Sequence, residues 1–409
     1  MVIIGGGIIG ATSALELTER GLRVALCEKG DIGAEQSTRN WGWVRRQGRD
    51  PVELPLAMIA RDMWRTLATR IGEDIGYQEC GIYYLASSRR EMAKYEGWLA
   101  RVAGAGLETK LLGPKDVSAM LPGASKNFLG GLYTAHDGRA EPSVVTAAVA
   151  EAARRKGASL LTRCAVRGVE TSAGEVSAVV TERGHIRCEA ALVTAGMWSR
   201  MFLRNLGINF EQLSVTATVA RIDATTTSID VSVGGTDFAF RKRRYGGYSI
   251  AVRNMNMANV TVDSLLLAKE FLQALRASRG DVRLRLGRYF IESMGHRKRW
   301  TNDDITIFEK VRINGADPIR NMATKALYNV VSAFPEFNGS RVTDAWSGVI
   351  DVTPTSLPTT SALPISGLFL ASGFSGHGFG LAPAVGGITA SLIMGKSPGM
   401  DLSAFKYRA

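Results

Sequence analysis

The sequence predicts an α/β fold: a Rossmann-like nucleotide-binding domain joined to a second, α+β domain built around an antiparallel sheet. Three observations support this prediction. The first ten residues, MVIIGGGIIG, read as a short strand, a glycine turn and the start of a helix. A second apolar segment, LRVALCE, follows the helix and ends in an acidic residue. Residues 214–313 instead alternate polar and apolar positions, as expected for strands of an antiparallel sheet.

The opening glycine turn has the spacing of a dinucleotide pyrophosphate site. A side chain at Gly5, Gly7 or Gly10 would obstruct the turn, the approach of backbone to phosphate, or the packing of helix on strand. The helix expected over residues 8–20 directs its free N–H groups and positive dipole end toward the phosphates. Glu28, about twenty residues beyond the glycines, is placed to accept hydrogen bonds from a ribose 2′-hydroxyl. The unit therefore predicts FAD or NAD rather than NADP, and the turn alone does not separate the first two.

The composition is that of an ordinary globular protein. The chain has 409 residues, of which 45% are hydrophobic and 22% are charged, and this length predicts two or three structural domains. Four cysteines, Cys27, Cys80, Cys164 and Cys188, lie far apart without a CxxC pair. Their spacing indicates neither a metal site nor a disulfide framework, and it fits a reducing, cytoplasmic compartment.

Neither a secretion signal nor a transmembrane segment is expected. The apolar start lacks a basic leader, and its glycines belong to the nucleotide turn. No uninterrupted apolar stretch reaches the roughly twenty residues that cross a bilayer, so at most a peripheral membrane contact is expected. The net charge of +12 would attract anions. Its clusters at residues 241–244 (RKRR) and 296–299 (HRKR) are interpreted as solvated faces, because neither belongs to a nucleic-acid-binding motif.

The pattern along the chain predicts alternating helices and strands. A long polar stretch over residues 29–51 is too irregular for a regular element and is typical of a functional loop. Expected helices cover residues 54–71, 89–105, a short piece of LLGPKDVSAMLPG, 143–156, 264–278 and a segment that ends near residue 334. Expected strands are GIYYLASS, ASLLTRCAVRGVE, VSAVVTERG, AALVTAG, VTATVARID, FAFRKR, YGGYSIAVR and ITIFEKVRI.

The nucleotide-binding domain is expected to be discontinuous. HDGRAEP and the helix after it begin its second piece, and AALVTAG places a glycine at the carboxyl end of a buried strand, where ligands bind to parallel sheets. We predict that residues 1–75, 135–213 and 325–409 form the nucleotide-binding domain. Residues 76–134 and 214–324 are then expected to form the substrate-binding domain.

Six motifs in a fixed order give the chain a specific resemblance. They are VIIGGGIIG followed by Glu28, the STRN loop, HDGRAEP before a helix, ALVTAGMWS, AWSGVIDVTPT and GFSGHGFGLAP. Together they resemble the FAD-dependent D-amino-acid oxidase superfamily over the whole chain, close to its glycine and sarcosine oxidase branch. The resemblance implies an FAD-binding domain of the GR2 or DAO type, an antiparallel substrate domain, and an amino-acid oxidase or dehydrogenase.

The segment GFSGHGFGLAPAVGG supports the same cofactor on physical grounds. Its glycines leave backbone amides free to face a planar ring, and the helix that starts near Ala382 points its positive end there. A reduced flavin carries negative charge near N1 and C2=O, which such a helix end would stabilise. His377, inside this segment, is interpreted as a residue that lines the flavin rather than as a base.

The resemblance assigns further residues to the cofactor. Val166 matches the adenine contact, and Arg45 or Arg46 stands at the entrance to the flavin ring, with a surface salt bridge as the alternative for this pair. The full set expected to bind FAD is Gly5, Gly7, Ile8, Ile9, Gly10, Glu28, Lys29, Ser37, Thr38, Arg39, Asn40, Trp41, Gly42, Val166, Thr194, Ala195, Gly196, Trp198, Gly348, Gly373, Gly376, His377, Gly378, Phe379 and Gly380.

Three departures from the family pattern concern the substrate and the attachment of the flavin. Ile350 stands where glycine oxidases have an arginine for the substrate carboxylate, and Gly380 stands where sarcosine oxidases have a lysine. Gly348 stands where sarcosine oxidases have the cysteine that bonds to flavin, so FAD is expected to be held non-covalently. A substrate carboxylate would need another cation. The candidates are Arg45, Arg46, Arg241, Arg243 and Arg320.

The resemblance implies oxidation of the CH–NH bond of an amino acid, by oxidative deamination or N-dealkylation: hydride passes from the amine-bearing carbon to flavin N5, and the imine is then hydrolysed. The protein would hold the C–H bond over N5 and exclude bulk water. Tyr245 and Tyr248 are candidates for substrate contact, with core packing as the alternative. The residues expected to act at the substrate are thus Arg45, Arg46, His377, Tyr245 and Tyr248. Reoxidation is expected by O2 or a quinone-type acceptor, and Lys242 is the nearest lysine by sequence pattern.

Two other functions stay open at the level of the sequence. One is a flavin-dependent dehydrogenase that acts on a 2-hydroxy acid. The other is a non-catalytic FAD-binding assembly protein, which the missing anchors at residues 350 and 380 suggest. Bleaching of the yellow protein by an amino acid, with release of ammonia, would separate an amino-acid oxidase or dehydrogenase from both.

Overall fold

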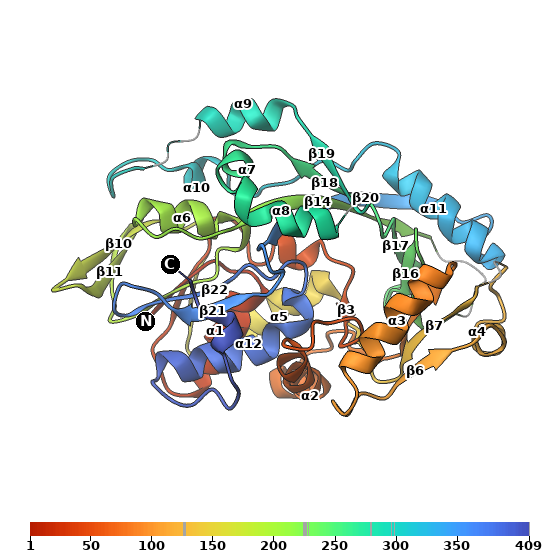
Figure 1. Cartoon of the computed structure of the whole chain (residues 1–409). Helices are drawn as coiled ribbons and strands as arrows, with labels where there is room; N and C mark the ends of the chain where they lie inside the picture. Colours follow the sequence, from red (N-terminus) through yellow and green to blue (C-terminus); the bar gives the residue numbers. More distant parts are fainter. Residues whose placement is uncertain are drawn as a thin grey trace.

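Two large sheets organise the structure (Figure 1). The computed structural model describes residues 1–125, 128–223, 227, 229–278, 280–295, 297 and 299–408. Over these residues, one sheet is mostly parallel and the other largely antiparallel, which confirms the predicted fold class.

The first sheet has six strands in the part of the chain that the structure describes. In spatial order they are β21 (Thr359–Ala362), β22 (Leu368–Ser372), β13 (Ala191–Val193), β1 (Val2–Ile4), β2 (Ala25–Cys27) and β9 (Ser159–Leu161). Every adjacent pair is parallel except β21 with β22. The short sequence VII of β1 is fully buried, as expected of a parallel strand that is covered on both faces.

Alternate residues of this sheet face two different cores. Ile3 packs with four helices: α1 (Ile8–Glu19), α2 (Leu54–Ile71), α5 (Pro142–Arg155) and α12 (Gly378–Ile393). Val2 and Ile4 pack on the other side. The elements there are α6 (Ser199–Asn205), α10 (Ile307–Lys310) and the small sheet of β10 (Val166–Ser172), β11 (Glu175–Thr181) and β12 (Gly184–Arg187). The carboxyl ends of the central strands, where a ligand of a parallel sheet would lie, are left facing the second sheet.

The second sheet has ten strands over the described residues. In order they are β19 (Val282–Arg285), β18 (Asn256–Asn259), β14 (Leu213–Ile222), β17 (Tyr248–Ala251), β16 (Ala239–Lys242), β15 (Ser232–Gly234), β5 (Ile82–Ala86), β7 (Gly130–Thr134) and β6 (Thr109–Leu112), with β20 (Val342–Val352) beside β14. Helices α3 (Arg89–Arg101), α4 (Pro114–Met120) and α11 (Met322–Ala333) flank it in Figure 1. A cluster of Phe and Tyr side chains, among them Phe240, Phe334 and Phe337, fills its core with α11.

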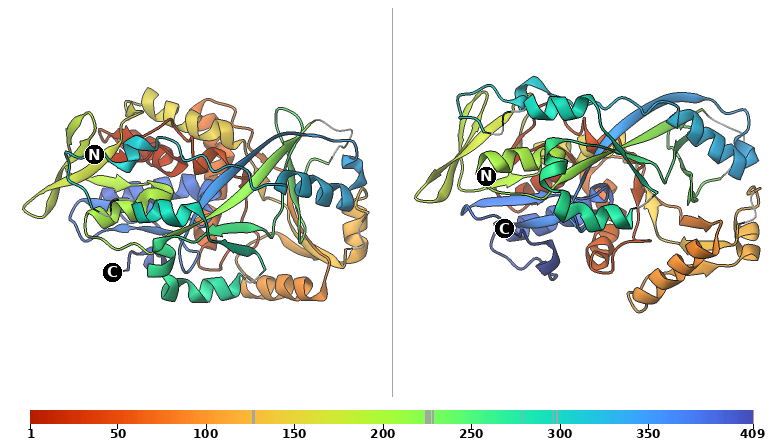
Figure 2. Two further views of the ribbon diagram at one scale, coloured as in Figure 1. Left: turned by 90° about the horizontal axis from the view of Figure 1, so that it is seen from above. Right: turned by 45° about the horizontal axis from the view of Figure 1, so that its top comes forward.

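A long antiparallel ribbon connects the two sheets. β14 and β20 pair from Leu213 with Val352 to Ile222 with Val342, and Figure 2 shows the ribbon crossing the molecule. A short sheet of β3 (Trp43–Val44), β8 (Gly138–Arg139) and β4 (Gln78–Glu79) fixes the loop that follows the nucleotide turn. The ribbon and this loop together form the far wall of the site described below.

Three expectations about local structure need correction. The segment ITIFEKVRI was predicted as a strand but contains the short helix α10, because Thr306 and Glu309 form a capping box that starts a helical turn. The helix expected over residues 264–278 is divided into α7 (Val262–Leu266) and α8 (Ala268–Ala277) at the buried Leu267. Within the RKRR cluster, Arg241 is not solvated, because it is 1% exposed and ion-paired with Glu141.

The HRKR cluster lies partly outside the described residues, since His296 and Lys298 are not among them. The domain boundaries stay a prediction. β20 and most of α11 fall within the range assigned to the nucleotide domain, but they pack on the ten-stranded sheet. A search of the described residues finds no helix with the length and apolar character needed to span a bilayer.

Candidate functional site

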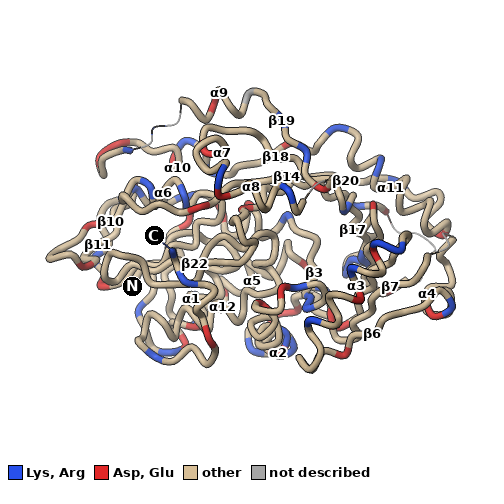
Figure 3. Tube along the Cα trace, viewed as in Figure 1, with Lys and Arg blue, Asp and Glu red and all other residues tan. Residues whose placement is uncertain are grey.

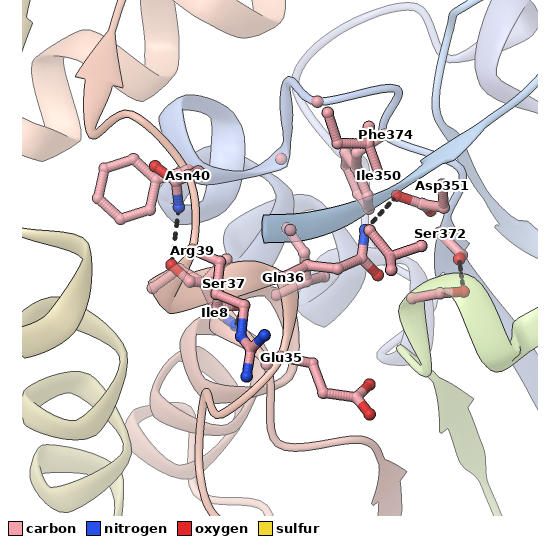
Figure 4. A pocket seen from close by; sticks show the side chains of 18 of the residues that line it. Ile8, Glu35, Gln36, Ser37, Arg39, Asn40, Ile350, Asp351, Ser372 and Phe374 are labelled. Carbon is pink, nitrogen blue, oxygen red and sulfur yellow. Dashed lines mark hydrogen bonds between the residues drawn. The ribbon is translucent and has the colours of Figure 1, made fainter. Parts of the chain in front are cut away.

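A cavity of about 460 Å³ lies between the two sheets, within the size range of small-molecule sites. One end is formed by the glycine turn after β1 and by the ends of β2 and β13. The other end is formed by β14, β20, the residue 39–49 loop and the start of α12. Figure 4 shows Gln36, Ser37 and Arg39 from the loop opposite Ile350 and Asp351 of β20.

The glycine turn is shaped so tightly that side chains are excluded. Gly5 has a φ of +110°, and a Cβ there would lie 2.6 Å from the carbonyl oxygen of Thr194. A Cβ at Gly10 would overlap the carbonyl oxygen of Gly5 and lie 2.8 Å from Thr194 Oγ1. Gly7 caps α1 in an extended conformation without a side-chain cap, and the N–H of Ile8 donates to Ser37 Oγ at 2.8 Å. The positive end of α1 therefore faces the cavity.

Glu28 is held at the end of β2 by backbone donors. Its Oε2 accepts from the N–H of Gly6 and its Oε1 from the N–H of Gly30, each at 2.7 Å. Burial raises the pKa of this carboxyl, and the two backbone hydrogen bonds oppose the shift. Each oxygen keeps a free lone pair, so Glu28 can still accept from a ligand hydroxyl on the cavity side.

Lys29 is not a free cation. Its Nζ donates to Glu35 Oε1 at 2.7 Å and lies 4.7 Å from the ring centroid of Trp198. Trp198 Nε1 in turn donates to Glu35 Oε2 at 2.9 Å. The positive charge of Lys29 is therefore balanced by Glu35, and the three side chains form one part of the wall beside the glycine turn.

Asp351 connects three parts of the cavity wall. It is 3% exposed and accepts from Gln36 Nε2 at 2.8 Å, from Gln212 Nε2 at 3.1 Å and from the N–H of Gly373 at 2.8 Å. Figure 4 shows the contact with Gln36. One carboxylate thus accepts hydrogen bonds from the loop, from Gln212 just before β14 and from Gly373 just after β22. The network therefore fixes the relative positions of these three elements.

A second helix N-terminus reaches the cavity at α12. Its N-cap, His377, makes no side-chain cap, and Nδ1 of this residue lies 3.1 Å from Glu53 Oε1. Glu53 is fully buried and also pairs with Arg49 NH1 at 3.3 Å. The three side chains form a charged cluster, here called the Arg49–Glu53–His377 cluster.

The cluster shifts the pKa values of its members in a consistent way. Burial alone would raise the pKa of Glu53, but the charge of Arg49 and the hydrogen bond from His377 hold it at about 2. Burial, helped by the charge of Arg49, lowers the pKa of His377 to about 4 against the opposing effect of Glu53. Burial likewise lowers the pKa of Arg49 to about 10. At neutral pH, Arg49 and Glu53 are therefore charged and His377 is neutral.

Two arginines converge on one aromatic ring at the far end of the cavity. The guanidinium carbon of Arg253 lies 3.9 Å from the ring centroid of Tyr84, and that of Arg45 lies 5.9 Å from it. Arg253 donates to the carbonyl oxygen of Gly235 at 3.2 Å, and Arg45 to that of Gln47. Within the part of the chain that the structure describes, neither has a carboxylate as an ion-pair partner, unlike Lys29 and Arg49. Arg39 also lacks one there, but it donates to the carbonyl oxygens of Ala34 and Ser347.

Most residues expected to hold FAD lie in the wall of this one cavity. These are Gly5, Gly7, Ile8, Ile9, Glu28, Lys29, Ser37, Arg39, Asn40, Trp41, Val166, Thr194, Ala195, Gly196, Trp198, Gly348, Gly376, His377, Gly378 and Phe379. Arg45, expected at the entrance to the ring, lines it as well. The structure thus brings together segments that are more than 300 residues apart in the sequence.

Five residues of the expected FAD set lie behind the wall instead. Gly10 packs α1 on the turn, and Thr38 Oγ1 donates to the carbonyl oxygen of Gly33 at 2.9 Å. A Cβ at Gly42 would lie 2.5 Å from the carbonyl oxygen of Ala140. Gly373 donates its N–H to Asp351, and Gly380 accepts from Trp64 Nε1 at 2.9 Å. Their contacts support the shape of the wall.

Several candidates for substrate contact lie away from the cavity, which corrects their expected placement. Arg46 is 2% exposed because Asp137 binds its side chain and backbone N–H. Tyr248 packs in the core of the ten-stranded sheet, where its hydroxyl donates to the carbonyl oxygen of Ile229 at 2.8 Å. Tyr245 is 63% exposed on a turn.

The remaining cation candidates are also placed elsewhere. Arg241 is buried against Glu141, and Arg243 lies 4.0 Å from the same carboxylate. Lys242 lies 3.8 Å from Asp230, and Arg320 is exposed on the surface. None of the four lines the cavity between the two sheets.

Sequence reasoning missed five residues that shape the site. They are Gln36, Arg49, Tyr84, Arg253 and Asp351. One signal was available for Arg253, because a charged residue closely follows the fully buried strand YSIA. Gln36, Tyr84 and Asp351 are distinguished only by partners that are distant in the sequence, whereas Arg49 pairs with Glu53 four residues away.

Comparisons with known proteins agree with this geometry. The family model described as "FAD dependent oxidoreductase" (DAO) matches residues 1–392. The chain is 26% identical to glycine oxidase of Geobacillus kaustophilus, covering 99% of this chain and 95% of that protein. It is 24% identical to the beta subunit of sarcosine oxidase of Rhodobacter capsulatus, covering 97% and 86%.

Among solved structures, an L-amino acid deaminase from Proteus vulgaris superposes with a TM-score of 0.94 at 28% identity, covering 99% of this chain and 95% of that chain. Some larger curated relatives, such as human mitochondrial sarcosine dehydrogenase, match about half of this chain, which spans only 24% of their length.

Proposed function

Because the chain belongs to the DAO family of FAD-dependent oxidoreductases, we propose that it binds FAD non-covalently in the cavity and oxidatively deaminates an α-amino acid. Its homology to glycine oxidase, sarcosine oxidase and L-amino acid deaminase confirms the resemblance that the sequence motifs indicated. The deaminase also supports an amino acid as the substrate, since it is 28% identical and covers 99% of this chain.

The residues of the cavity fit a dinucleotide with a planar ring. The turn at Gly5 and Gly10 has no room for a Cβ, as expected where backbone must approach a pyrophosphate closely. Two helix N-termini, those of α1 and α12, open into the same cavity without side-chain caps, and such ends favour anionic groups. Glu28 would accept from the ribose, and Val166 would lie at the adenine. Non-covalent attachment is supported by Gly348, which offers no nucleophile on the β20 wall.

When bound, FAD supplies the two-electron oxidant for the substrate. The chain's own residues bind the substrate and control its protons. Arg45 and Arg253 are proposed to hold the substrate carboxylate, because they are the cavity cations that meet at one ring and lack a carboxylate partner within the described residues. This convergence of the two arginines is the single observation that supports a substrate with a carboxylate.

The Arg49–Glu53–His377 cluster would keep the charges and protonation states on the α12 side of the cavity constant near neutral pH. Because Glu53 is ionised and His377 is neutral at neutral pH, the hydrogen bond between them requires a proton on Nδ1 of His377. Its Nε2 is then an acceptor. The aromatic and apolar side chains of the wall, among them Trp41, Phe374 and Ile350, would exclude water from the reacting C–H bond.

The function is tested by anaerobic titration of the purified yellow protein. The panel comprises L- and D-amino acids, N-methyl amino acids and 2-hydroxy acids, with absorbance and released ammonia as readouts. We expect an α-amino acid to bleach the flavin and to release ammonia after turnover. Bleaching by a 2-hydroxy acid alone would identify the dehydrogenase alternative, and no bleaching by any member would favour a non-catalytic FAD-binding protein. O2 and a soluble quinone, added separately afterwards, identify the electron acceptor, and cell fractionation tests the expected cytoplasmic location.

A further inference from the structure

The substrate end of the cavity carries more positive charge than one carboxylate would balance. Arg45, Arg49 and Arg253 all line the cavity. Glu53 is ionised and pairs with Arg49, while His377 is neutral at neutral pH. Figure 3 shows basic and acidic positions close to β3, the strand that precedes Arg45 and Arg49. Three guanidinium groups and one carboxylate leave two positive charges at this end.

These charges share one location. The guanidinium carbons of Arg253 and Arg45 lie 3.9 Å and 5.9 Å from the same ring, that of Tyr84. The charge of Arg45 also acts on each member of the Arg49–Glu53–His377 cluster. Arg45 is therefore close both to the Tyr84 ring and to the cluster, and the two unbalanced charges belong to one region of the cavity.

The described part of the chain offers no carboxylate to balance Arg45 and Arg253. Glu91 of α3 acts on Arg253 only from beyond ion-pair distance, and it accepts hydrogen bonds from Thr236 and from the N–H of Ser87. The carboxylates of the described cavity wall have partners of their own, and they are Glu28, Asp31, Glu35 and Asp351. The counter-charge must therefore come from a ligand.

Both arginines keep N–H donors for such a ligand. Arg45 donates to the carbonyl oxygen of Gln47, and Arg253 donates to that of Gly235 and hydrogen-bonds with the side chain of Tyr95. A guanidinium group has five N–H donors and binds a carboxylate through two of them. Each arginine is therefore able to bind a carboxylate of its own.

We propose that the substrate is a dicarboxylic α-amino acid, with one carboxylate bound at Arg45 and the other at Arg253. This inference rests on the proposed function, because it specifies the substrate of the same site. An amino acid that reacts with an uncharged amine and has one carboxylate would leave one of the two charges in the cavity unbalanced, which is unfavourable. The N-termini of α1 and α12 favour the anionic groups of FAD, so these two arginines are left for the substrate.

An amino acid with an apolar side chain is the competing substrate. Val219, Val349 and Ile350 line the same cavity and would suit such a side chain. They would equally contact the methylene groups between two carboxylates. The number of carboxylates that the site binds therefore separates the two substrates.

The first experiment measures binding to the oxidised holoenzyme without turnover. Isothermal titration calorimetry at constant ionic strength compares succinate with succinamate and glutarate with glutaramate. Each second compound is the half-amide of the first, with nearly the same shape and one carboxylate. We expect at least one dicarboxylate to bind about tenfold or more tightly than its half-amide. Equal affinity within both pairs, or no binding of any of the four compounds, overturns the proposal.

Variants locate the preference at the two arginines. Arg45→Gln should reduce the preference for the dicarboxylate to about twofold or less, because only one guanidinium group then remains for a ligand. Arg253→Gln should have the same effect. Arg320→Gln, on an exposed residue away from the cavity, is the matched control and should keep the full preference. Retained flavin absorbance shows that each variant is folded. A preference that survives in both cavity variants overturns the proposal.

The second experiment separates this inference from the proposed function. Anaerobic reduction of the flavin is compared for the two enantiomers of glutamate, aspartate, glutamine, asparagine and leucine. We expect glutamate or aspartate to be about tenfold or more efficient than its own amide. Equal reduction by the amides or by leucine overturns the dicarboxylic substrate and leaves oxidative deamination intact. No reduction by any amino acid, with the preference for dicarboxylates retained in calorimetry, would instead overturn the proposed function and with it an amino acid as the substrate.

Discussion

The two ends of the cavity are built in different ways. At the nucleotide end, the wall is mainly backbone: the turn at Gly5 to Gly10 and the hydrogen bonds that Glu28 accepts from Gly6 and Gly30. At the substrate end, the wall is made of side chains from separate elements, with Arg45, Tyr84 and Arg253 supplied by a loop and two strand regions. The first end recognises a feature common to dinucleotides, and the second decides what is oxidised.

This difference predicts how each end tolerates mutation. A backbone cradle has no spare volume, so any added atom there displaces main chain. A side-chain wall is adjustable, and a substitution changes affinity while the fold remains. The following predictions test the contrast, beginning with the largest effect.

Gly10→Ala should abolish retention of FAD. The new Cβ would overlap the backbone carbonyl oxygen of Gly5, which no side-chain rotation can relieve, and it would also crowd Thr194 Oγ1. Overpacking of this kind costs about 1–3 kcal/mol and occasionally more, and we expect a cost above this range because backbone has to move. The measurement is the ratio of flavin to protein absorbance after purification, together with thermal unfolding. Gly97→Ala is the control, because a Cβ there meets nothing within 4 Å. Retained FAD in Gly10→Ala would show that the turn is more adjustable than its contacts indicate.

Glu53→Gln should destabilise the fold by about 3–5 kcal/mol, because it leaves the buried charge of Arg49 without a counterion. Urea unfolding measures the loss. Glu151→Gln, which breaks the exposed pair with Arg154 on α5, is the control and should unfold like the wild type. A small effect of Glu53→Gln would mean that another acceptor or water compensates Arg49.

Arg253→Gln should raise the KM for the amino acid about 10- to 100-fold with little change in FAD binding, because a charge-assisted hydrogen bond contributes about 1.5–3 kcal/mol. Arg45→Gln should act in the same direction. Steady-state kinetics with a substrate and with its amine analogue that lacks the carboxylate measure the effect. The analogue should be oxidised equally by wild type and variant. Arg320→Gln, on an exposed residue away from the cavity, is the control. An equal loss with both compounds would contradict a carboxylate contact.

The same contrast explains what the sequence could reveal. The nucleotide turn, the first two strands and Glu28 follow from local patterns, because their partners are neighbours in sequence or are dictated by glycine geometry. The helix over residues 54–71 was predicted with the bounds of α2. Arg253 and Asp351 act through partners that only the tertiary fold brings near, such as Tyr84 and Gln212. Tyr248 shows the opposite kind of error. A tyrosine in an alternating strand is equally compatible with a substrate contact and with core packing, and the structure places Tyr248 in the core.

The smallest effect concerns pH and the Arg49–Glu53–His377 cluster. The pKa of His377 falls from 6.5 to about 4 on folding, so between these values the unfolded chain binds a proton that the folded chain does not. Stability must then decrease as pH falls through this window, by about 2 kcal/mol between pH 7 and pH 5. Glu53, with its pKa at about 2, adds a similar loss only below its ordinary value of 4.5.

Urea unfolding at several pH values, with FAD in constant excess, measures this dependence. His377→Asn should remove most of this dependence between pH 7 and pH 5, because asparagine at position 377 has no titratable side chain. His185→Asn, on the exposed strand β12, is the matched control and should keep the slope of the wild type. If His377→Asn kept that slope as well, the imidazole would not be held neutral by its surroundings. The proposed acceptor role of Nε2 would then lose its basis, while the carboxylate contacts of Arg45 and Arg253 would stand.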